Sequence, residues 1–184
     1  IPLGTALIFS AVTIIPFERM AFLNITIILL AGGSYMLYRL KFLTRAGSLN
    51  AYLLGVYLFG FLFFSWAVPV IFFFLTSVLF TRINALVNKK PGTGSQPRNS
   101  WQVIANSMPA MVFSAVFLLT KNPLFIYLFA ATVAAVTADT WASEIGPVFN
   151  RKCLSLTDFR SGKAGISGGI SVAGSLAALI GSFS

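Results

Sequence analysis

The sequence predicts an all-α protein, a polytopic bundle of about seven transmembrane helices that forms a single transmembrane domain over residues 1–184. Apolar residues make up 57% of the chain and charged residues 9%, and the mean hydropathy is +0.87. Soluble domains carry roughly 25% charged residues. Several apolar runs reach about 20 residues, the length that crosses a bilayer. They are continuous rather than alternating, which argues against a transmembrane barrel.

The apolar runs divide the chain into seven helices. The third and fourth come from one nearly unbroken run, which is too long for a single crossing. We place the break near Ser65, upstream of Pro69. The helices are expected at about residues 2–17, 20–38, 49–64, 66–81, 101–119, 123–146 and 166–183.

The cations predict the orientation of this bundle. Every second connection is rich in Lys and Arg, and these three connections, at about 39–48, 82–100 and 147–165, hold eleven of the 13 cations. The other connections hold only Arg19 and Lys121. Cytoplasmic loops of membrane proteins carry the excess of cations. We therefore expect an integral membrane protein whose N-terminus and three long loops are cytoplasmic. The net charge of +9 also suits anionic lipid headgroups better than nucleic acid.

Small residues recur at four-residue spacing in three of the helices. Such stripes let helix backbones approach closely in lipid. They predict that the third, sixth and seventh helices form a tight inner cluster. The stripes are Gly47, Ala51 and Gly55; Ala130, Ala134, Ala138 and Ala142; and Gly169, Ala173, Ala177 and Gly181.

The composition excludes several kinds of chemistry. The chain has no histidine, which removes histidine-dependent nucleophiles, bases and metal sites. Its one cysteine, Cys153, excludes an internal disulfide and a multi-cysteine zinc site. Chemistry must therefore use carboxylates, Lys and Arg, hydroxyls, amides and the backbone.

Two of the four carboxylates, Asp139 and Glu144, lie in "ADTWASEIGP" at the end of the sixth helix. A carboxylate at membrane depth needs a cation, which is either Arg98 or Arg45 in a structural ion pair or a bound Mg²⁺. Five helical steps rotate a side chain by about 140° and advance it by about 7.5 Å. The two therefore do not share one ion comfortably. We expect Asp139 to be the deeper Mg²⁺ ligand and Glu144 to hold a second metal or a cation such as Arg98.

Two further polar clusters fall beside the cytoplasmic connections, "LTRAGSLNAYLLG" and "PRNSWQVIANS". The helix after Asn99 offers free N–H groups to a phosphate, and Arg98 offers a bidentate guanidinium. Asn106 either braces the fold by an interhelical hydrogen bond or binds a ligand. The glycines of "GKAGISGGIS" either cradle phosphate or form a plain hinge.

These motifs, in the order "LTRAG", "RNSWQVIAN", "ADTWASEIGP" and "GISGGIS", resemble a membrane family over roughly residues 40–175. The family includes the phytyl-phosphate kinase of plant vitamin E synthesis and its prokaryotic relatives. The resemblance implies phosphoryl transfer from a nucleoside triphosphate, CTP, to an isoprenyl monophosphate, giving an isoprenyl diphosphate with Mg²⁺ as cofactor. Its expected partners are that nucleotide, an isoprenyl phosphate of phytyl or geranylgeranyl type, and membrane lipids, with no nucleic acid.

The motif positions supply the candidate site residues. The residues expected to act in catalysis are Asp139, Glu144 and Arg98, and the expected metal ligands are Asp139 and Glu144. Substrate and nucleotide binding falls on Thr44, Arg45, Asn99, Gln102, Asn106, Thr140, Ser143, Lys163, Ser167, Gly168 and Gly169.

The sequence departs from the family at two motifs. The family's Gly-Thr-Asn-Gly-Gly reads with Ile166 and Ser167 at its second and third positions, so a Thr hydroxyl and an Asn amide are missing. The family's Ala-Asn-Gly ends here in Ser107. Relatives tend to continue past the last residue of this chain, which leaves open a shortened chain or a bundle completed as a homo-oligomer.

Two other functions remain open from the residues alone. One is nucleotidyl transfer from CTP to a lipid phosphate, which needs the same metal and cations. The other is a transporter or lipid-binding protein without chemistry, which would place polar residues on both halves of the membrane. The polar clusters gather at one face, which favours an enzyme.

Overall fold

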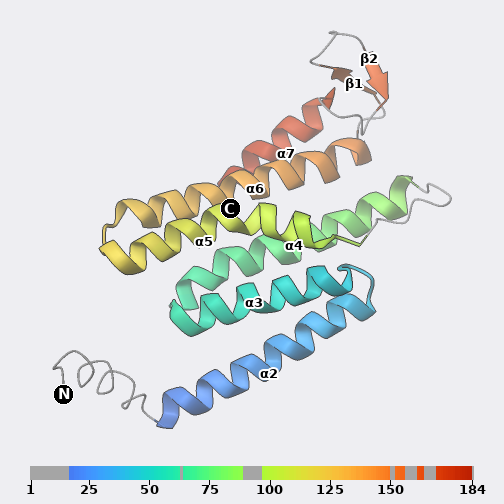
Figure 1. Cartoon of the computed structure of the whole chain (residues 1–184). Helices are drawn as coiled ribbons and strands as arrows, with labels where there is room; N and C mark the ends of the chain where they lie inside the picture. The colour runs from blue at the N-terminus through green and yellow to red at the C-terminus, as the bar shows by residue number, and fades with distance from the viewer. Residues whose placement is uncertain are drawn as a thin grey trace, which may run out of the picture.

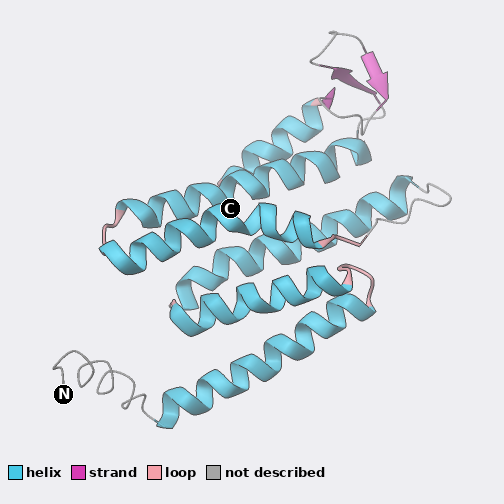
Figure 2. Ribbon diagram, viewed as in Figure 1, coloured by secondary structure: helices cyan, strands magenta, loops and turns pink. Residues whose placement is uncertain are grey.

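The computed structural model describes residues 17–62, 64–88, 97–149, 152–155, 161–163 and 169–183, and within them it is a helical bundle with one small sheet (Figures 1 and 2). The helix expected at 2–17 lies outside the described residues except for its last position. The elements are α2 (Phe17–Arg39), α3 (Arg45–Phe61), α4 (Phe64–Asn88), α5 (Ser100–Thr120), α6 (Leu124–Phe149), β1 (Lys152–Ser155), β2 (Ser161–Lys163), β3 (Gly169–Ile170) and α7 (Val172–Ser182).

The helices confirm an integral membrane helical protein. Within the described residues, α2, α4, α5 and α6 are long and apolar enough to cross a membrane. The long apolar run is broken as expected, although α3 ends at Phe61, with Leu62 as its C-cap, slightly before the predicted Ser65. Helices α4 and α6 run farther than expected, to Asn88 and Phe149, so that polar residues predicted in loops lie on helices.

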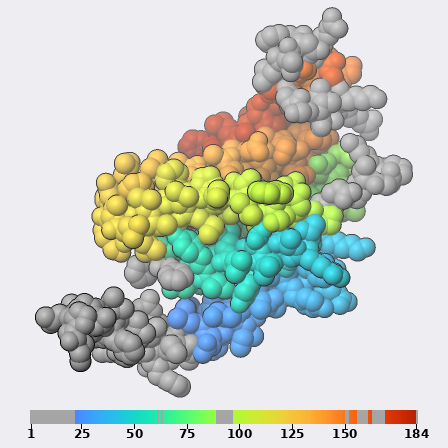
Figure 3. Space-filling model, in the orientation of Figure 1, coloured from blue at the N-terminus to red at the C-terminus, as the bar shows by residue number. Residues whose placement is uncertain are grey.

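Helix α6 is the centre of the packing. It contacts α4, α5 and α7, while α3 packs against both α2 and α5 (Figure 1). Helix α2 lies at the outer edge of this arrangement, against α3 (Figure 3). The expected cluster of the third, sixth and seventh helices is therefore wrong for the third, because α3 packs mainly on α2 and α5. A small-residue stripe indicates a close contact but does not name the partner helix.

An aromatic cluster fills the centre of the bundle. The ring centroid of Trp66 lies 4.8 Å from that of Phe129 and 5.1 Å from that of Phe117. Leu58 and Ala67 are buried in the same core. Lipid is as apolar as these side chains, so dispersion and close fit hold the helices here. Residues of α3, α4, α5 and α6 thus meet in one packed layer.

Helices α6 and α7 approach through small residues, as predicted, but the contact includes Gly174, which is not in the predicted stripe, whereas Gly169 of that stripe lies in β3, outside α7. A Cβ added at Gly174 would lie 3.2 Å from the carbonyl oxygen of Ala142, and one at Gly181 would lie 3.2 Å from Cα of Ala138. Both neighbours are backbone atoms, which cannot rotate away. The two helices therefore pack backbone to backbone.

The connection from α6 to α7 carries strands that the sequence did not predict. The sheet has the order β2-β1-β3, with both pairs antiparallel. Lys152 of β1 is the direct partner of Lys163 of β2. Ser171 directly follows β3. Its hydroxyl caps α7 by accepting the N–H of Gly174 at 3.1 Å. This connection thus leads directly into the glycine-lined contact with α6.

The packing of α6 on α7 predicts the effect of a larger side chain at Gly174. Gly174→Leu should lower the free energy of unfolding by about 1–3 kcal/mol, because the new side chain meets the Ala142 carbonyl. The matched control is Gly60→Leu on α3, where a Cβ meets nothing within 4 Å and the helix gains about 1 kcal/mol of propensity. Thermal unfolding in detergent measures both. Equal stability of the two variants would contradict the close contact.

Candidate functional site

Two of the predicted polar clusters are joined by a backbone bridge. The N–H of Arg98 donates to the carbonyl of Phe42 at 2.9 Å, and the N–H of Thr44 donates to the carbonyl of Arg98 at 3.0 Å. Leu43 and Arg98 thus form an isolated parallel bridge between the α2–α3 turn and the segment before α5. The structure therefore brings "LTRAG" and "PRNSW" together.

Both helices that start at this bridge are capped by predicted binding residues. The hydroxyl of Thr44 accepts the N–H of Gly47 at 3.1 Å at the start of α3. Asn99 and Gln102 form a capping box at the start of α5, each side chain accepting the other's backbone N–H at 3.0 Å. These oxygens already satisfy helix N–H groups, so Thr44 and Asn99 position the site. The positive ends of two helix dipoles lie side by side.

Gly47 is the residue that permits the close approach. A Cβ at this position would lie 2.6 Å from the carbonyl oxygen of Arg98, which is closer than real Cβ contacts. The glycine of "LTRAG" is therefore required by the backbone of the neighbouring cluster.

The bridge aims the side chain of Arg98 into the bundle. Its Nη2 donates to the hydroxyl of Ser77 on α4 at 2.5 Å, and Ser77 is completely buried. Burial lowers the pKa of the Arg98 guanidinium, and the nearby negative charge of Glu144 acts in the opposite direction. Arginine remains protonated in proteins. Arg98 therefore places a positive charge in partly dehydrated surroundings.

Glu144 is held by α4. Its Oε1 accepts the hydroxyl of Thr81 at 2.7 Å and its Oε2 accepts the amide of Asn84 at 3.0 Å. The amide of Asn88 in turn donates to Oδ1 of Asn84 at 2.5 Å. Among the described residues Glu144 makes no direct hydrogen bond to Arg98, so the two interact through their charges. Glu144 was expected to take a second metal or to hold a cation such as Arg98, and its carboxylate hydrogen-bonds to α4 instead.

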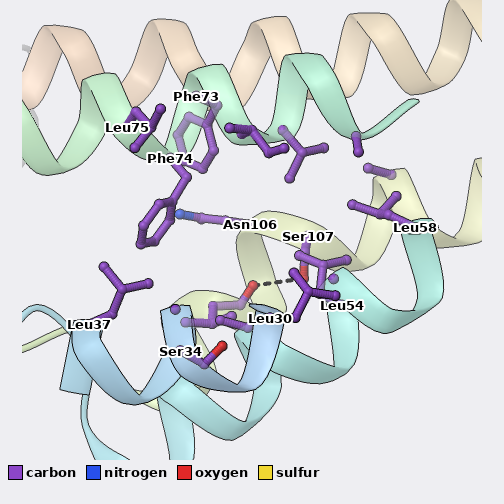
Figure 4. Close-up of a pocket in the computed structure, with 18 of the residues that line it drawn as sticks. Leu30, Ser34, Leu37, Leu54, Leu58, Phe73, Phe74, Leu75, Asn106 and Ser107 are labelled. Carbon is purple, nitrogen blue, oxygen red and sulfur yellow. Dashed lines mark hydrogen bonds between the residues drawn. The ribbon is translucent and has the colours of Figure 1, made fainter. Parts of the chain in front are cut away.

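A cavity of about 320 Å³ lies beside Arg98, among residues of α2, α3, α4, α5 and α6. It is lined mainly by leucine, valine, phenylalanine, alanine and glycine residues, and Leu54, Leu58 and Phe73 are among them (Figure 4). Polar side chains gather at one end, namely Arg98, Gln102, Asn106, Ser107 and Ser34. The shape is that of a pocket for an apolar chain with a polar, cationic end.

Asn106 points into this cavity, towards Phe74 (Figure 4). Its side-chain amide makes no hydrogen bond to another described residue, whereas the hydroxyl of the adjacent Ser107 donates to the Val103 carbonyl at 2.8 Å. The amide is not fully buried, and it remains open to a group that enters the cavity. Of the two expectations for Asn106, this geometry favours the ligand over the brace.

Asp139 lies on another face of α6. Its side chain is exposed and makes no hydrogen bond to any residue that the structure describes, whereas Glu144 faces α4. The described residues contain no group of three or more His, Cys, Asp and Glu that would hold a metal. Mg²⁺ commonly binds one or two carboxylates and completes its shell with phosphate and water. The single carboxylate of Asp139 fits such an ion, but Asp139 and Glu144 do not converge on one.

The remaining predicted residues that the structure describes do not line the cavity. Arg45 donates from Nε to the hydroxyl of Tyr38 at 2.9 Å on the surface. Thr140 is buried, and its carbonyl accepts the hydroxyl of Ser143 at 3.0 Å. Gly169 is exposed in β3, and the backbone of Lys163 is in β2. Ser167, Gly168 and the side chain of Lys163 lie outside the described part of the chain.

Four polar residues of α4 belong to the site and were not predicted. They lie on one face of the helix, at a spacing of four, three and four positions, at the end of an apolar run. That periodicity was a usable signal in the sequence. The residues are Ser77, Thr81, Asn84 and Asn88.

Comparisons with known proteins identify membrane relatives. Residues 26–184 match the family described as integral membrane protein DUF92. The chain is also similar to the uncharacterized membrane protein MJ0933 of Methanocaldococcus jannaschii, with 26% identity over 166 residues, covering 90% of this chain and 69% of the relative. No solved structure matches the chain significantly.

The bridge predicts that any side chain at Gly47 lowers the free energy of unfolding. Gly47→Ala should lower the free energy of unfolding by about 1–3 kcal/mol, because its Cβ would collide with the Arg98 carbonyl. Gly32→Ala on α2 is the control, since a Cβ there meets nothing within 4 Å and alanine favours the helix by about 1 kcal/mol. Thermal unfolding of the purified variants checks this. A Gly47→Ala protein as stable as the control would show that the bridge is not held this closely.

Proposed function

We propose a function from the premise that this chain belongs to the DUF92 family of integral membrane proteins. It is a membrane phosphotransferase that converts an isoprenyl monophosphate of phytyl or geranylgeranyl type into the diphosphate, with CTP as phosphoryl donor. The observation that carries this proposal is the apolar cavity ending at Arg98, Gln102 and Asn106. The resemblance of the polar motifs to prenyl-phosphate kinases supports it independently.

The cavity suits the two halves of such a substrate. Hydrocarbon side chains line most of it, which favours an isoprenoid chain. At the polar end, the guanidinium of Arg98 would pair with the phosphate, and the amides of Gln102 and Asn106 would donate to its oxygens. The hydrogen bond from Arg98 to Ser77 fixes the guanidinium before the substrate arrives. The substrate is thereby oriented with its phosphate towards the polar connections.

The proposed reaction needs little acid–base chemistry. An oxygen of the prenyl phosphate attacks the γ-phosphorus of CTP, the new O–P bond forms, and the bond to the β-bridging oxygen breaks to release CDP. The attacking oxygen is already anionic, so no strong general base is required. Phosphoryl transfer depends mainly on positioning and on neutralising charge. A site with cations, carboxylates and no histidine is adequate for this reaction.

The two carboxylates take different roles in the proposal. Asp139, with no partner among the described residues, would hold a Mg²⁺ ion that also binds the nucleotide phosphates. Such an ion supplies neutralisation of the phosphate charge. Glu144, held by Thr81 and Asn84, keeps a negative charge near Arg98 and so favours its charged form. Glu144 is therefore a positioning residue.

The proposal includes an orientation. The cation-rich connections and the N-terminus face the cytoplasm in a bundle of seven helices, as the charge distribution predicts. The nucleotide then reaches Arg98 from the cytoplasm, while the lipid reaches it from the bilayer. Thr140, Ser143, Lys163 and the glycine-rich turn at Ser167, Gly168 and Gly169 are proposed for the nucleotide side of the site.

The function is tested with purified protein, labelled CTP, Mg²⁺ and geranylgeranyl phosphate, followed by mass analysis of the lipid. We expect geranylgeranyl diphosphate, no turnover of the free alcohol, and a loss of about 30- to 150-fold in kcat/KM for Arg98→Gln, because a charge-assisted pair worth about 2–3 kcal/mol is removed. A lipid carrying CMP would instead identify a cytidylyltransferase. Absence of any product would reject the enzyme.

The carboxylates predict a second result. Asp139→Asn should abolish turnover in a folded protein, whereas Glu144→Gln should leave measurable activity with a raised Mg²⁺ requirement, since one residue would bind the ion and the other acts through Arg98. Turnover measured against Mg²⁺ concentration distinguishes them. Full activity of Asp139→Asn would remove that residue from the mechanism. An identical loss of metal binding in both variants would indicate one shared ion.

A further inference from the structure

The cavity has a mouth within the membrane-spanning part of the bundle. Leu29 of α2 and Leu75 and Ile71 of α4 line the cavity, yet their side chains are 68%, 61% and 39% exposed. Residues that both line a cavity and reach the surface form its rim. Leu29 and Leu75 lie well inside the two helices, far from their cytoplasmic ends. This part of the rim therefore opens towards lipid.

Helix α2, on one side of this mouth, is held mainly by α3. Its fixed points are the carbonyl of Ser34, which accepts the hydroxyl of Ser48 at 2.5 Å, and Leu30, which packs over Gly55. No α2 side chain that the structure describes, from Phe22 to Arg39, is buried. The cavity is thus bounded on this side by α2, none of whose described side chains is buried (Figure 4).

Gly33 of α2 leaves free space on the α2 side of the mouth, where a passage into the cavity would run. It lines the cavity, and a Cβ at this position would meet nothing within 4 Å. Packing therefore does not require a glycine, although glycine costs a helix interior about 1 kcal/mol relative to alanine. The neighbouring Gly32 has the same open surroundings but does not line the cavity. The missing side chain at Gly33 leaves free space where a chain would run.

We propose that the cavity is loaded sideways from the bilayer, between α2 and α4, by one hydrocarbon chain whose anionic phosphate ends at Arg98, and that Gly33 determines the width of this entry. The inference rests on the proposed function for the identity of the chain. The occupant follows from the charge and shape of the cavity, since an apolar lining that ends on a guanidinium and two amides matches a single-chain lipid phosphate. Gly33 is then the residue that determines access for the lipid.

The experiment measures the association rate of radiolabelled geranylgeranyl phosphate with the full chain in nanodiscs, because a narrower entry slows association and dissociation alike and leaves the equilibrium affinity unchanged. We compare wild type, Gly33→Leu and the matched control Gly32→Leu. Both substitutions replace glycine by a better helix former, so the thermal unfolding midpoint should not fall in either. Gly33→Leu should slow association by about tenfold or more, and Gly32→Leu should leave the rate within about twofold, because only the former narrows the passage.

Each outcome decides the proposal. Equal association rates of the two variants, or slow association in both, would overturn the role of Gly33. If Gly33→Leu unfolds, the smaller Gly33→Val takes its place, and unfolding of that variant as well would assign the glycine to folding instead. A wild type that does not bind the lipid phosphate would reject both the entry and the proposed function. Binding without phosphoryl transfer would reject the proposed function and leave the entry intact.

Discussion

The backbone bridge between Leu43 and Arg98 is the constraint on which the site depends. Lipid is as apolar as the helix surfaces, so hydrophobicity does not choose which transmembrane helices become neighbours. Directed hydrogen bonds and close backbone contacts make that choice. The bridge ties the α2–α3 turn to the start of α5, and Gly47 allows the contact. The polar end of the cavity and the caps of two helices follow from this one junction.

Hydrogen-bond partners separate the polar groups that hold the fold from those that are left open for the proposed ligand and ion. Thr44, Asn99 and Glu144 have their side-chain oxygens occupied by helix N–H groups or by α4, and they hold the site in shape. Asn106 and Asp139 have no such partners among the described residues. In a membrane an unsatisfied polar group is costly, so these two side chains are the ones that a ligand or ion would complete.

The sequence predicted most of the helices because long apolar runs separated by cations leave few alternatives. It also predicted that Asp139 and Glu144 point to different faces, since that follows from helical geometry alone. It misplaced α3, because small residues indicate close contact without specifying the partner. The cavity was not predictable either, since its lining comes from five helices whose side chains look like ordinary lipid-facing residues. The polar residues of α4, from Ser77 to Asn88, recur at helical spacing, which can be recognised in the sequence. They were missed because the end of this helix was predicted to be a loop.

The bridge also has a consequence for biogenesis. The two segments that the bridge joins lie before α3 and after α4 in the sequence. The bridge therefore cannot form until both of these helices have left the ribosome and entered the bilayer. Ser77 of α4 is then already present, but Glu144 is translated only with α6, 46 residues after Arg98. Arg98 therefore meets Ser77 before it has a carboxylate nearby, and the order of translation itself delays the complete surroundings of that charge.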